Sequence, residues 1–233
     1  MGVRAAFFDV GDTLVEGWAP DYRDRARAAL AARYGERDWY DAFLDAKHEP
    51  LDHDVPWRQE TLAIIERWLR GQQVALDDVE IDTIRSLCSV PLDTVARLTD
   101  GAADALRWCK ANGLTVVLVT NTLWRGDEEV REDWRRFGLA EHIDGVASSH
   151  SVGWRKPHPA MFQRALEIAG VQGAEAFMVG DRLGADIWGA RQLGIRGVLR
   201  KTIGPAPQAR VAAVPDATLV TLRDLPAVVR PWL

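Results

Sequence analysis

Short apolar runs alternate with longer segments of helical periodicity along most of the chain. Short apolar runs bounded by turn residues are typical of buried strands. They lie at residues 4–9, 114–119, 145–148, 176–179, 197–199 and 218–220. The run at 114–119 is β-branched almost throughout, which indicates a parallel strand buried on both faces.

Helical segments separate these predicted strands. The apolar spacing predicts helices at about 100–112, 128–137, 159–169, 181–194 and 222–229. Gly113, Gly138 and Gly194 are well placed to end three of them in a left-handed conformation. Strands that alternate with helices predict a parallel sheet with right-handed crossovers. We therefore expect an α/β fold with a doubly wound parallel sheet.

Residues 17–99 differ, because no strand-like apolar run appears among them. Helical periodicity predicts helices at 22–34, 39–47, 57–69 and 81–87, separated by Gly35, Pro50–Pro56 and Gly71. We call this segment the helical block and expect it to form a small domain of its own. The larger α/β core domain is then made of residues 1–16 and 100–233.

Composition narrows the class of protein. Apolar residues make up 47% of the chain and charged residues 27%, as in an ordinary globular protein. The net charge of −5 gives no electrostatic case for a nucleic-acid or membrane partner. No apolar run is long enough to span a bilayer, and residues 2–4 lead directly into the first strand, so we expect no signal peptide. Cys88 and Cys109 lack CxxC spacing and fit buried thiols in a cytoplasmic protein, whose oligomeric state stays open.

Polar residues follow several predicted strands at the point where each strand ends. They are Asp9, Thr120, Lys156 and the pair Asp181 and Asp186. The carboxyl ends of parallel strands share one edge of a sheet, where open α/β folds bind their ligands. An aspartate directly after two phenylalanines is costly to bury without a cation or a role. A carboxylate, a hydroxyl, an ammonium group and a carboxylate pair suit phosphoryl transfer, because they can bind and neutralise a negatively charged group.

The two later aspartates have the spacing of a cation site. Asp181 ends a strand and Asp186 begins a helix, so both can face one hard cation such as Mg²⁺. The residues alone also allow simpler interpretations: Asp9 as a turn residue, Thr120 or Asp186 as a helix cap, and Lys156 as a solvated loop residue.

These segments resemble, in order, the four motifs of the haloacid dehalogenase superfamily of aspartate-nucleophile hydrolases. The matching segments are residues 8–14 (Phe-Asp-Val-Gly-Asp-Thr-Leu, a partial match), 116–121, Lys156–Pro157 and 179–186. The resemblance covers nearly the whole chain and implies a Rossmann-like core. It also makes the helical block similar to the C1-type cap of this family, which closes over the site and selects the substrate.

The resemblance implies a magnesium-dependent phosphatase that acts on a small phosphorylated metabolite. Asp9 would attack phosphorus and become an aspartyl phosphate, which water then hydrolyses. Thr120 and Asn121 would bind the phosphoryl group, and Lys156 would bind it and neutralise charge.

The resemblance also implies the metal ligands. Asp9, Asp181 and the backbone carbonyl of Gly11 would hold Mg²⁺. Asp186 would either bind the metal as well or contact its ligands without binding it.

One position departs from the family pattern. Phosphatases of this family usually have a second aspartate two residues after the nucleophile, which acts as general acid and base. Gly11 occupies that position. Either the next residue, Asp12, acts in its place, or the protein handles only substrates with good leaving groups. The replacement puts proton transfer to the leaving group in question, a contribution of about 10²- to 10⁴-fold in rate.

Two other functions fit the departure. The 2-haloacid dehalogenases of the family also lack the second acid, because halide leaves without a proton, and they need no magnesium. They would show an arginine soon after the first motif, where the nearest candidates are Arg23 and Arg25. A catalytically weak family member that serves as a binding or regulatory protein is the other alternative.

Overall fold

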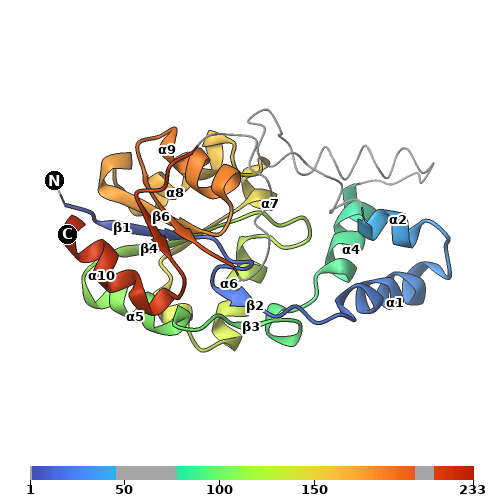
Figure 1. Ribbon diagram of the computed structural model, residues 1–233. Helices are drawn as coiled ribbons and strands as arrows, with labels where there is room; N and C mark the ends of the chain where they lie inside the picture. The colour runs from blue at the N-terminus through green and yellow to red at the C-terminus, as the bar shows by residue number, and fades with distance from the viewer. Residues whose placement is uncertain (1, 46–77, 203–212) are drawn as a thin grey trace.

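A six-stranded parallel sheet forms the centre of the molecule. The computed structural model describes residues 2–45, 78–202 and 213–233, and Figure 1 shows the sheet with helices on both faces. The strand order is β5-β4-β1-β6-β7-β8. The strands are β1 (Ala5–Phe8), β4 (Thr115–Thr120), β5 (Gly145–Ser148), β6 (Ala176–Gly180), β7 (Arg196–Arg200) and β8 (Ala217–Leu219). The predicted α/β fold with a doubly wound parallel sheet is confirmed.

The first strand lies inside the sheet. It pairs in parallel with β4, Ala5 opposite Thr115, and with β6, Ala5 opposite Ala176. Its side chains alternate between two apolar clusters, with Ala6 and Phe8 in one and Ala5 and Phe7 in the other. A strand covered on both faces has no polar side, which is why the run is apolar throughout.

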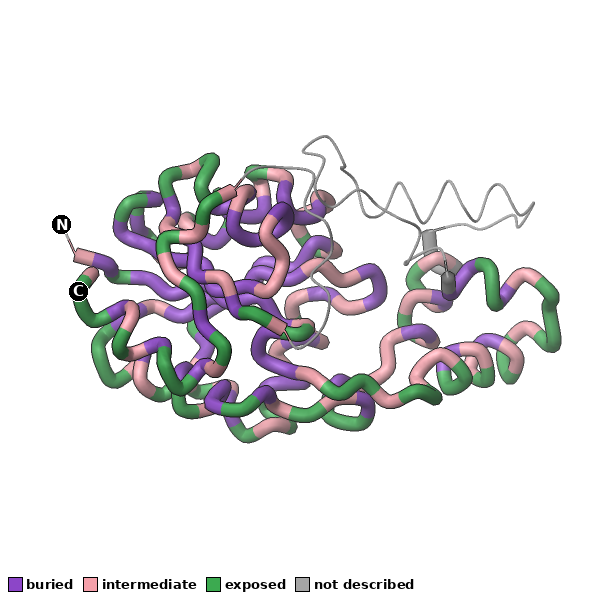
Figure 2. Tube along the Cα trace, viewed as in Figure 1, coloured by how far each residue is buried: buried purple, intermediate pink, exposed green. Residues whose placement is uncertain are grey.

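Helices cover the two faces of the sheet and make three layers. The cluster that contains Phe8 also takes in side chains of α5 (Ala102–Ala111), α6 (Asp127–Arg136) and α10 (Leu225–Val229). The cluster that contains Phe7 takes in α8 (Pro159–Ala169) and α9 (Gly189–Arg191). In Figure 2 the strands are almost entirely buried between these helices.

The helical block builds an apolar cluster of its own from α1 (Tyr22–Tyr34), α2 (Tyr40–Asp45) and α4 (Asp78–Cys88). Leu123 and Trp124, which follow β4 in the core, complete this cluster. The rings of Trp124 and Phe43 lie 5.2 Å apart. The block therefore packs on a loop of the core as well as being joined to it through the chain.

A short antiparallel ribbon lies where the chain enters and leaves the helical block (Figure 1). It pairs β2 (Val15–Glu16) with β3 (Arg97–Leu98). The expectation that residues 17–99 hold no strand is therefore wrong at Arg97–Leu98. Two residues make no recognisable apolar run, and the two strands that pair lie far apart in the sequence. Arg97 and Glu16 also form an ion pair across the ribbon, 3.2 Å apart.

The remaining elements are close to the predicted ones. Helix 181–194 begins as a π-helical segment, Leu183–Trp188, and the short helix α7 (Ser149–Val152) was not predicted. The predicted helix 57–69 lies outside the described residues. Short 3₁₀ turns occur at Leu92–Thr94, Ala140–His142, Gly173–Glu175, Leu222–Asp224 and Arg230–Trp232. Within the described ranges, no helix has the length and apolar character needed to cross a membrane.

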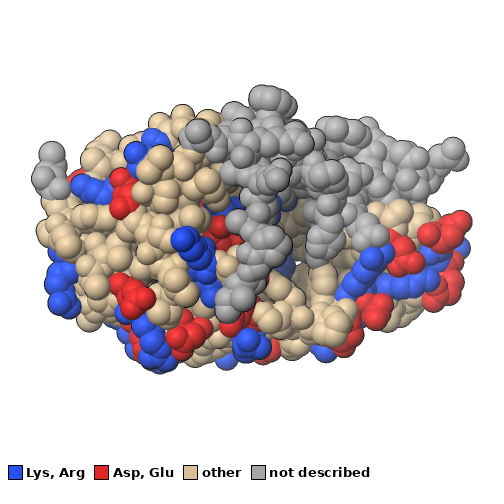
Figure 3. Space-filling model, viewed as in Figure 1, with Lys and Arg blue, Asp and Glu red and all other residues tan. Residues whose placement is uncertain are grey.

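Charges on the visible face are mixed rather than gathered by sign (Figure 3). Over α1 and α2 the basic and acidic side chains pair, as Arg27 does with Glu36 at 2.8 Å and Arg23 with Asp41 at 3.5 Å. Such paired charges on an exposed surface contribute little to stability. Among the described residues, they form no large patch of one sign on this face.

Candidate active site

Asp9 lies at the carboxyl edge of the sheet, as its place directly after β1 predicts. Its backbone N–H donates to the carbonyl of Val179 on the neighbouring strand at 2.9 Å. The residue is only 8% exposed, and its carboxylate accepts a hydrogen bond from the Thr13 hydroxyl at 3.2 Å. The strand pairing therefore fixes the main chain, and Thr13 fixes one face of the carboxylate.

Lys156 links Asp9 to the far side of the site. Its ammonium group donates to Oδ1 of Asp9 and to Oδ1 of Asp186, both at 2.6 Å, and the residue is 2% exposed. Burial works against the charged amine, but the carboxylates of Asp186 and Asp9 outweigh it and raise the pKa of Lys156. The solvated-loop interpretation of Lys156 is excluded, because this amine is a buried cation between two acids.

Asp186 approaches the site over a glycine. Its residue is 1% exposed, and its Oδ2 accepts from the backbone N–H of Arg182 at 3.0 Å. A Cβ on Gly180 would lie 2.3 Å from the Asp186 carboxyl carbon, so a side chain there would displace Asp186. Asp186 lies inside the π-helical segment and not at a helix N-cap.

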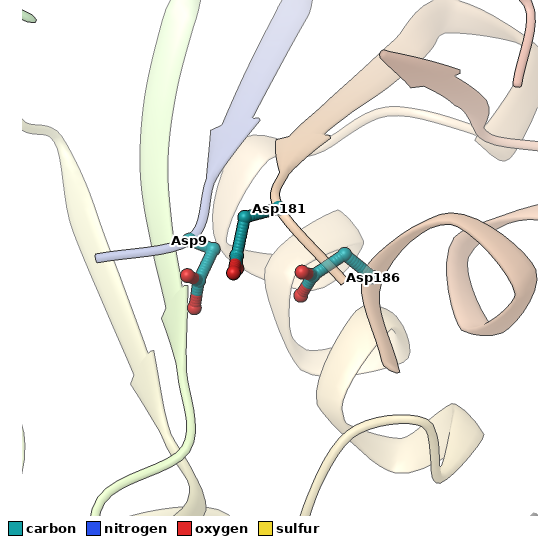
Figure 4. Close-up of side chains that lie close together, drawn as sticks. All are labelled: Asp9, Asp181 and Asp186. Atoms are coloured by element: carbon teal, nitrogen blue, oxygen red, sulfur yellow. The ribbon is translucent and has the colours of Figure 1, made fainter. Parts of the chain in front are cut away.

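Asp181 completes a cluster of three carboxylates, which converge from the end of β1 and the segment after β6 in Figure 4. One oxygen of each of Asp9, Asp181 and Asp186 lies within 4.8 Å of the others. Burial raises the pKa of Asp181 to about 8, and the negative charges of Asp9 and Asp186 add to the effect. A divalent cation would relieve this repulsion, and the hard oxygen donors are those that Mg²⁺ prefers. The residues therefore fit a magnesium site.

Thr120 and Asn121 lie at the end of β4, beside Asp9. Thr120 pairs with Ser148 of β5 and is buried. The Asn121 side chain contacts the main chain of Lys156: its Oδ1 accepts from the Lys156 N–H at 2.7 Å, and its Nδ2 donates to the Lys156 carbonyl at 3.1 Å. The side-chain amide of Asn121 is thus already engaged, and phosphate binding at Asn121 remains a prediction.

Asp12 lies in the same turn as Asp9, on the exposed side. It is the one non-glycine residue in the described part of the chain with a positive φ, 55°. Its Oδ1 accepts from the indole N–H of Trp18 at 3.1 Å, and its carbonyl accepts from the Arg200 guanidinium. Its charge also contributes to raising the pKa of Asp181, so the carboxylate lies near the site.

Gly11 has no left-handed φ. A Cβ on it would lie 3.4 Å from the Trp18 ring, an ordinary contact. The backbone conformation therefore does not require glycine at position 11. The left-handed conformation that favours glycine occurs at the next position, which is Asp12. Metal binding by the Gly11 carbonyl remains a prediction.

Sequence reasoning missed several residues that support the site, namely Thr13, Gly180 and Arg200. Thr13 belongs to the first motif, and its spacing of four from Asp9 is a usable signal. Arg200 is buried and also donates to Glu16 at 3.0 Å. It lies far from this turn in sequence, so only the fold brings it there.

At the carboxyl edge of the Rossmann-like sheet lie a buried carboxylate, a lysine shared between two acids and a third acid. Open α/β folds bind their ligands at this edge, so the arrangement defines an α/β protein with a charged ligand site there. A sequence profile of haloacid dehalogenase-like hydrolases matches residues 3–194. The chain belongs to this family.

Individual relatives belong to the same family of hydrolases or are phosphatases by name. The chain is 41% identical over 209 residues to glyceraldehyde 3-phosphate phosphatase of Pyrococcus abyssi, an alignment that covers 84% of this chain and 80% of that protein. It is 36% identical to human haloacid dehalogenase-like hydrolase domain-containing protein 3, over 47% of this chain and 41% of the human protein. The chain therefore aligns with less than half of the length of the human protein and of its bovine and mouse counterparts.

A solved structure of similar fold is the 2-haloacid dehalogenase of Pseudomonas syringae. It superposes with a TM-score of 0.69 at 27% identity, and the alignment covers 99% of this chain and 100% of that one.

Proposed function

We propose that the protein is a magnesium-dependent phosphatase that hydrolyses a small phosphorylated metabolite through an aspartyl phosphate at Asp9. The observation that carries the proposal is the Lys156 ammonium group, held at 2.6 Å from both Asp9 and Asp186 beside a third carboxylate. Two buried acids and a lysine suit a substrate group that is itself anionic and is bound with a cation.

Asp9 is the nucleophile in this proposal. Its carboxylate attacks phosphorus, the bond from phosphorus to the leaving oxygen breaks, and the phosphoryl group is carried as an acyl phosphate. Thr120 hydrogen-bonds a phosphoryl oxygen, and the Lys156 ammonium group compensates the charge that develops on it. Mg²⁺, held by Asp9, Asp181 and Asp186 with the Gly11 carbonyl, would supply further neutralisation of the phosphoryl charge.

Asp12 is the general acid and base. It gives a proton to the leaving oxygen as that oxygen departs, and it later takes one from the water that hydrolyses the aspartyl phosphate. Oδ1 of Asp12 accepts the Trp18 indole hydrogen bond, so Oδ2 is the oxygen left for this proton. Trp18 is 45% exposed and lies on the connection into the helical block.

The helical block, residues 17–99, is the cap in this proposal, and residues 1–16 and 100–233 are the catalytic core. Its separate apolar cluster and its entry through the β2–β3 ribbon support the division. A cap over the carboxyl edge would exclude bulk water while the aspartyl phosphate is present and would select the substrate. The buried thiols of Cys88 and Cys109 fit a reducing cytoplasm.

The relatives support the substrate class. The glyceraldehyde 3-phosphate phosphatase of Pyrococcus abyssi and the phosphoserine phosphatase of Thermus thermophilus are both named for small phosphorylated metabolites. The second of these alignments covers 38% of this chain, so it supports a phosphorylated metabolite as a class and no single compound.

A second candidate, 2-haloacid dehalogenase, is favoured by Gly11 and by the similar Pseudomonas syringae structure. The arginines that would serve a halide are engaged elsewhere. Arg23 pairs with Asp41 on α2, and Arg25 bonds Asp21 at 2.9 Å and the Thr94 carbonyl. These contacts favour the phosphatase.

A comparison of two product assays tests the proposal. The purified protein is given a panel of small phosphate monoesters and, separately, 2-chloropropionate, each with and without Mg²⁺. Phosphate release that needs Mg²⁺, with no halide release, is the expected result. Halide release without Mg²⁺ would instead establish the dehalogenase, and release of neither product would count against both activities.

A further inference from the structure

Asn121 holds the main chain of Lys156 at two points. Its Oδ1 accepts the Lys156 N–H at 2.7 Å while its Nδ2 donates to the carbonyl of the same residue at 3.1 Å. The side-chain amide of Asn121 therefore bonds both the N–H and the carbonyl of Lys156, 35 positions away, as the main chain of a neighbouring strand would. The two bonds leave the side chain of Asn121 with one free N–H and one free lone pair.

The next residue repeats the arrangement. The backbone N–H of Thr122 donates to Oγ of Ser149 at 2.9 Å, and the same hydroxyl donates back to the Thr122 carbonyl at 2.8 Å. Ser149 is fully buried. The loop after β4, residues 121–126, is thus fastened at two successive residues to the segment that runs from β5 to Lys156.

The other end of this loop is anchored as well. Trp124 lies in the apolar cluster of the helical block. The Arg125 guanidinium donates to the Val90 carbonyl at 2.9 Å and to Asp133 of α6 at 2.7 Å. Asp133 also accepts from the backbone N–H of Leu92 at 2.9 Å. The loop is therefore a fixed support for whatever Asn121 holds.

Asn121 holds the main chain of Lys156, whose side chain is long and flexible. The Lys156 amine lies at the end of a four-carbon stem, and both of its contacts are 2.6 Å. Lysine has many rotamers and no planar fork that would fix its direction. A shift of about 1 Å in a positioning group can cost about 10²-fold in rate.

We infer that Asn121 is a positioning residue for Lys156: its side chain fixes the lysine main chain and does not bind the phosphoryl group. The inference deepens the proposed function and rests on it wherever turnover is measured. It assigns to Asn121 a role that differs from the phosphate contact implied by its place in the second motif. It also makes the contribution of Asn121 to catalysis depend on the presence of the lysine amine.

A double-mutant cycle tests this dependence, with magnesium and p-nitrophenyl phosphate as the assay. Asn121→Ala is expected to lower kcat by about tenfold or more while leaving KM within about twofold. In a Lys156→Ala background the same substitution is expected to cost less than about twofold, because its target is gone. The same fold-loss in both backgrounds, or a loss confined to KM, would overturn the inference in favour of a direct contact with the substrate.

Asn112→Ala is the matched control. Asn112 also donates its side-chain amide to a main-chain carbonyl, that of Trp108 at 2.8 Å, but at the end of α5. Its kcat and KM are expected to equal those of the wild type. Asn121→Ser provides a second variant if the alanine protein does not fold, with the same expected pattern.

Amide hydrogen exchange gives a readout that needs neither metal nor turnover. The Lys156 N–H is expected to exchange at least about tenfold faster in Asn121→Ala than in the wild type, and at the wild-type rate in Asn112→Ala. We call the two hydrogen bonds from Asn121 to the Lys156 main chain the clamp. An unchanged exchange rate would show that the clamp does not hold Lys156 in solution. A wild type without turnover would overturn the proposed function, whereas the exchange rate would still decide for or against the clamp.

Discussion

The two sides of the site are built differently. On one side Lys156 and Asp186 are buried, and the lysine is held by carboxylates at 2.6 Å and by Asn121 through its main chain. On the other side Asp12 is exposed, in a left-handed turn, and its carboxylate is held by the half-exposed Trp18. The groups that would neutralise charge are fixed in the core, and the group that would move a proton lies where the chain turns toward the helical block.

This difference separates two functions, electrostatic stabilisation on the buried side and proton transfer on the exposed side. Electrostatic stabilisation depends on groups that are already in place, because reorganisation during the reaction is costly. Proton transfer to a leaving group needs an acid that comes within hydrogen-bond reach of the leaving oxygen.

Among the substitutions outside the nucleophile, the largest effect is expected on the fixed side. Lys156→Ala should lower kcat for p-nitrophenyl phosphate by about 10²- to 10³-fold, because the phosphoryl charge and the buried Asp9 and Asp186 lose their cation. Steady-state kinetics measure it, and Lys201→Ala, which removes an exposed lysine just after β7, is the control. A loss below about threefold would contradict the role given to this amine.

The next effect is a gain on the proton-transfer side. Gly11→Asp restores an acid two residues after Asp9, at a position with no left-handed φ and room for a Cβ. It should raise turnover of an alkyl phosphate such as glycerol phosphate by about 10-fold or more, and change p-nitrophenyl phosphate little, because nitrophenolate leaves without a proton. An equal effect on both esters, in a folded variant, would mean that acid catalysis is not what limits the wild type.

Removal of one carboxylate should weaken metal binding. Asp181→Ala is expected to reduce Mg²⁺ affinity at pH 8 by about 10- to 100-fold or more, since even supporting residues of metal sites have effects of that size. Titration calorimetry measures it. Asp216→Ala, which removes an aspartate that pairs with Arg191 outside the site, should bind Mg²⁺ as the wild type does.

The same carboxylate makes metal binding depend on pH. Because the pKa of Asp181 is about 8 in the folded protein without metal, a proton occupies this group at lower pH and competes with the cation. Mg²⁺ affinity should fall by up to about tenfold per pH unit below pH 8, with release of a proton on binding.

The raised pKa also affects stability. The folded state keeps the Asp181 proton that the unfolded state loses near pH 4, so this group makes the metal-free protein less stable as the pH rises from about 4 to about 8. Thermal denaturation in chelator should show this trend. Asp181→Asn should reduce it, and an unchanged trend would contradict the assignment.

The smallest effect is expected at Trp18. Trp18→Phe removes one exposed hydrogen bond to the Asp12 carboxylate. A typical hydrogen bond contributes about 0.5–1.5 kcal/mol, so turnover of an alkyl phosphate should fall by at most about tenfold. Turnover of p-nitrophenyl phosphate should stay within about twofold. Loss on both esters alike would point to a general disturbance of the turn and away from Asp12.

Much of the core could be predicted because its signals are local. Apolar runs at 114–119 and 176–179 coincide with β4 and β6 to within one residue at each end, since strands buried on both faces have no polar positions. Asp9, Lys156, Asp181 and Asp186 were predicted from their places at strand ends, and the structure brings the three aspartates and the lysine together.

The support of the site could not be predicted in the same way. The clamp of Asn121 on Lys156 and the bond from Arg200 to the Asp12 carbonyl join residues far apart in sequence. The strand β3 was missed because two residues carry no periodicity. Contacts of this kind depend on the fold as a whole and have no local pattern.

The most direct measurement is the hydrolysis of p-nitrophenyl phosphate by the wild type and by Asp9→Asn, each with and without Mg²⁺. The substrate bypasses the proton-transfer side, so it tests the nucleophile alone. The account predicts Mg²⁺-dependent turnover in the wild type and a loss of about 10⁴-fold or more in the folded variant. Turnover that survives in Asp9→Asn would contradict the central claim that Asp9 carries the phosphoryl group.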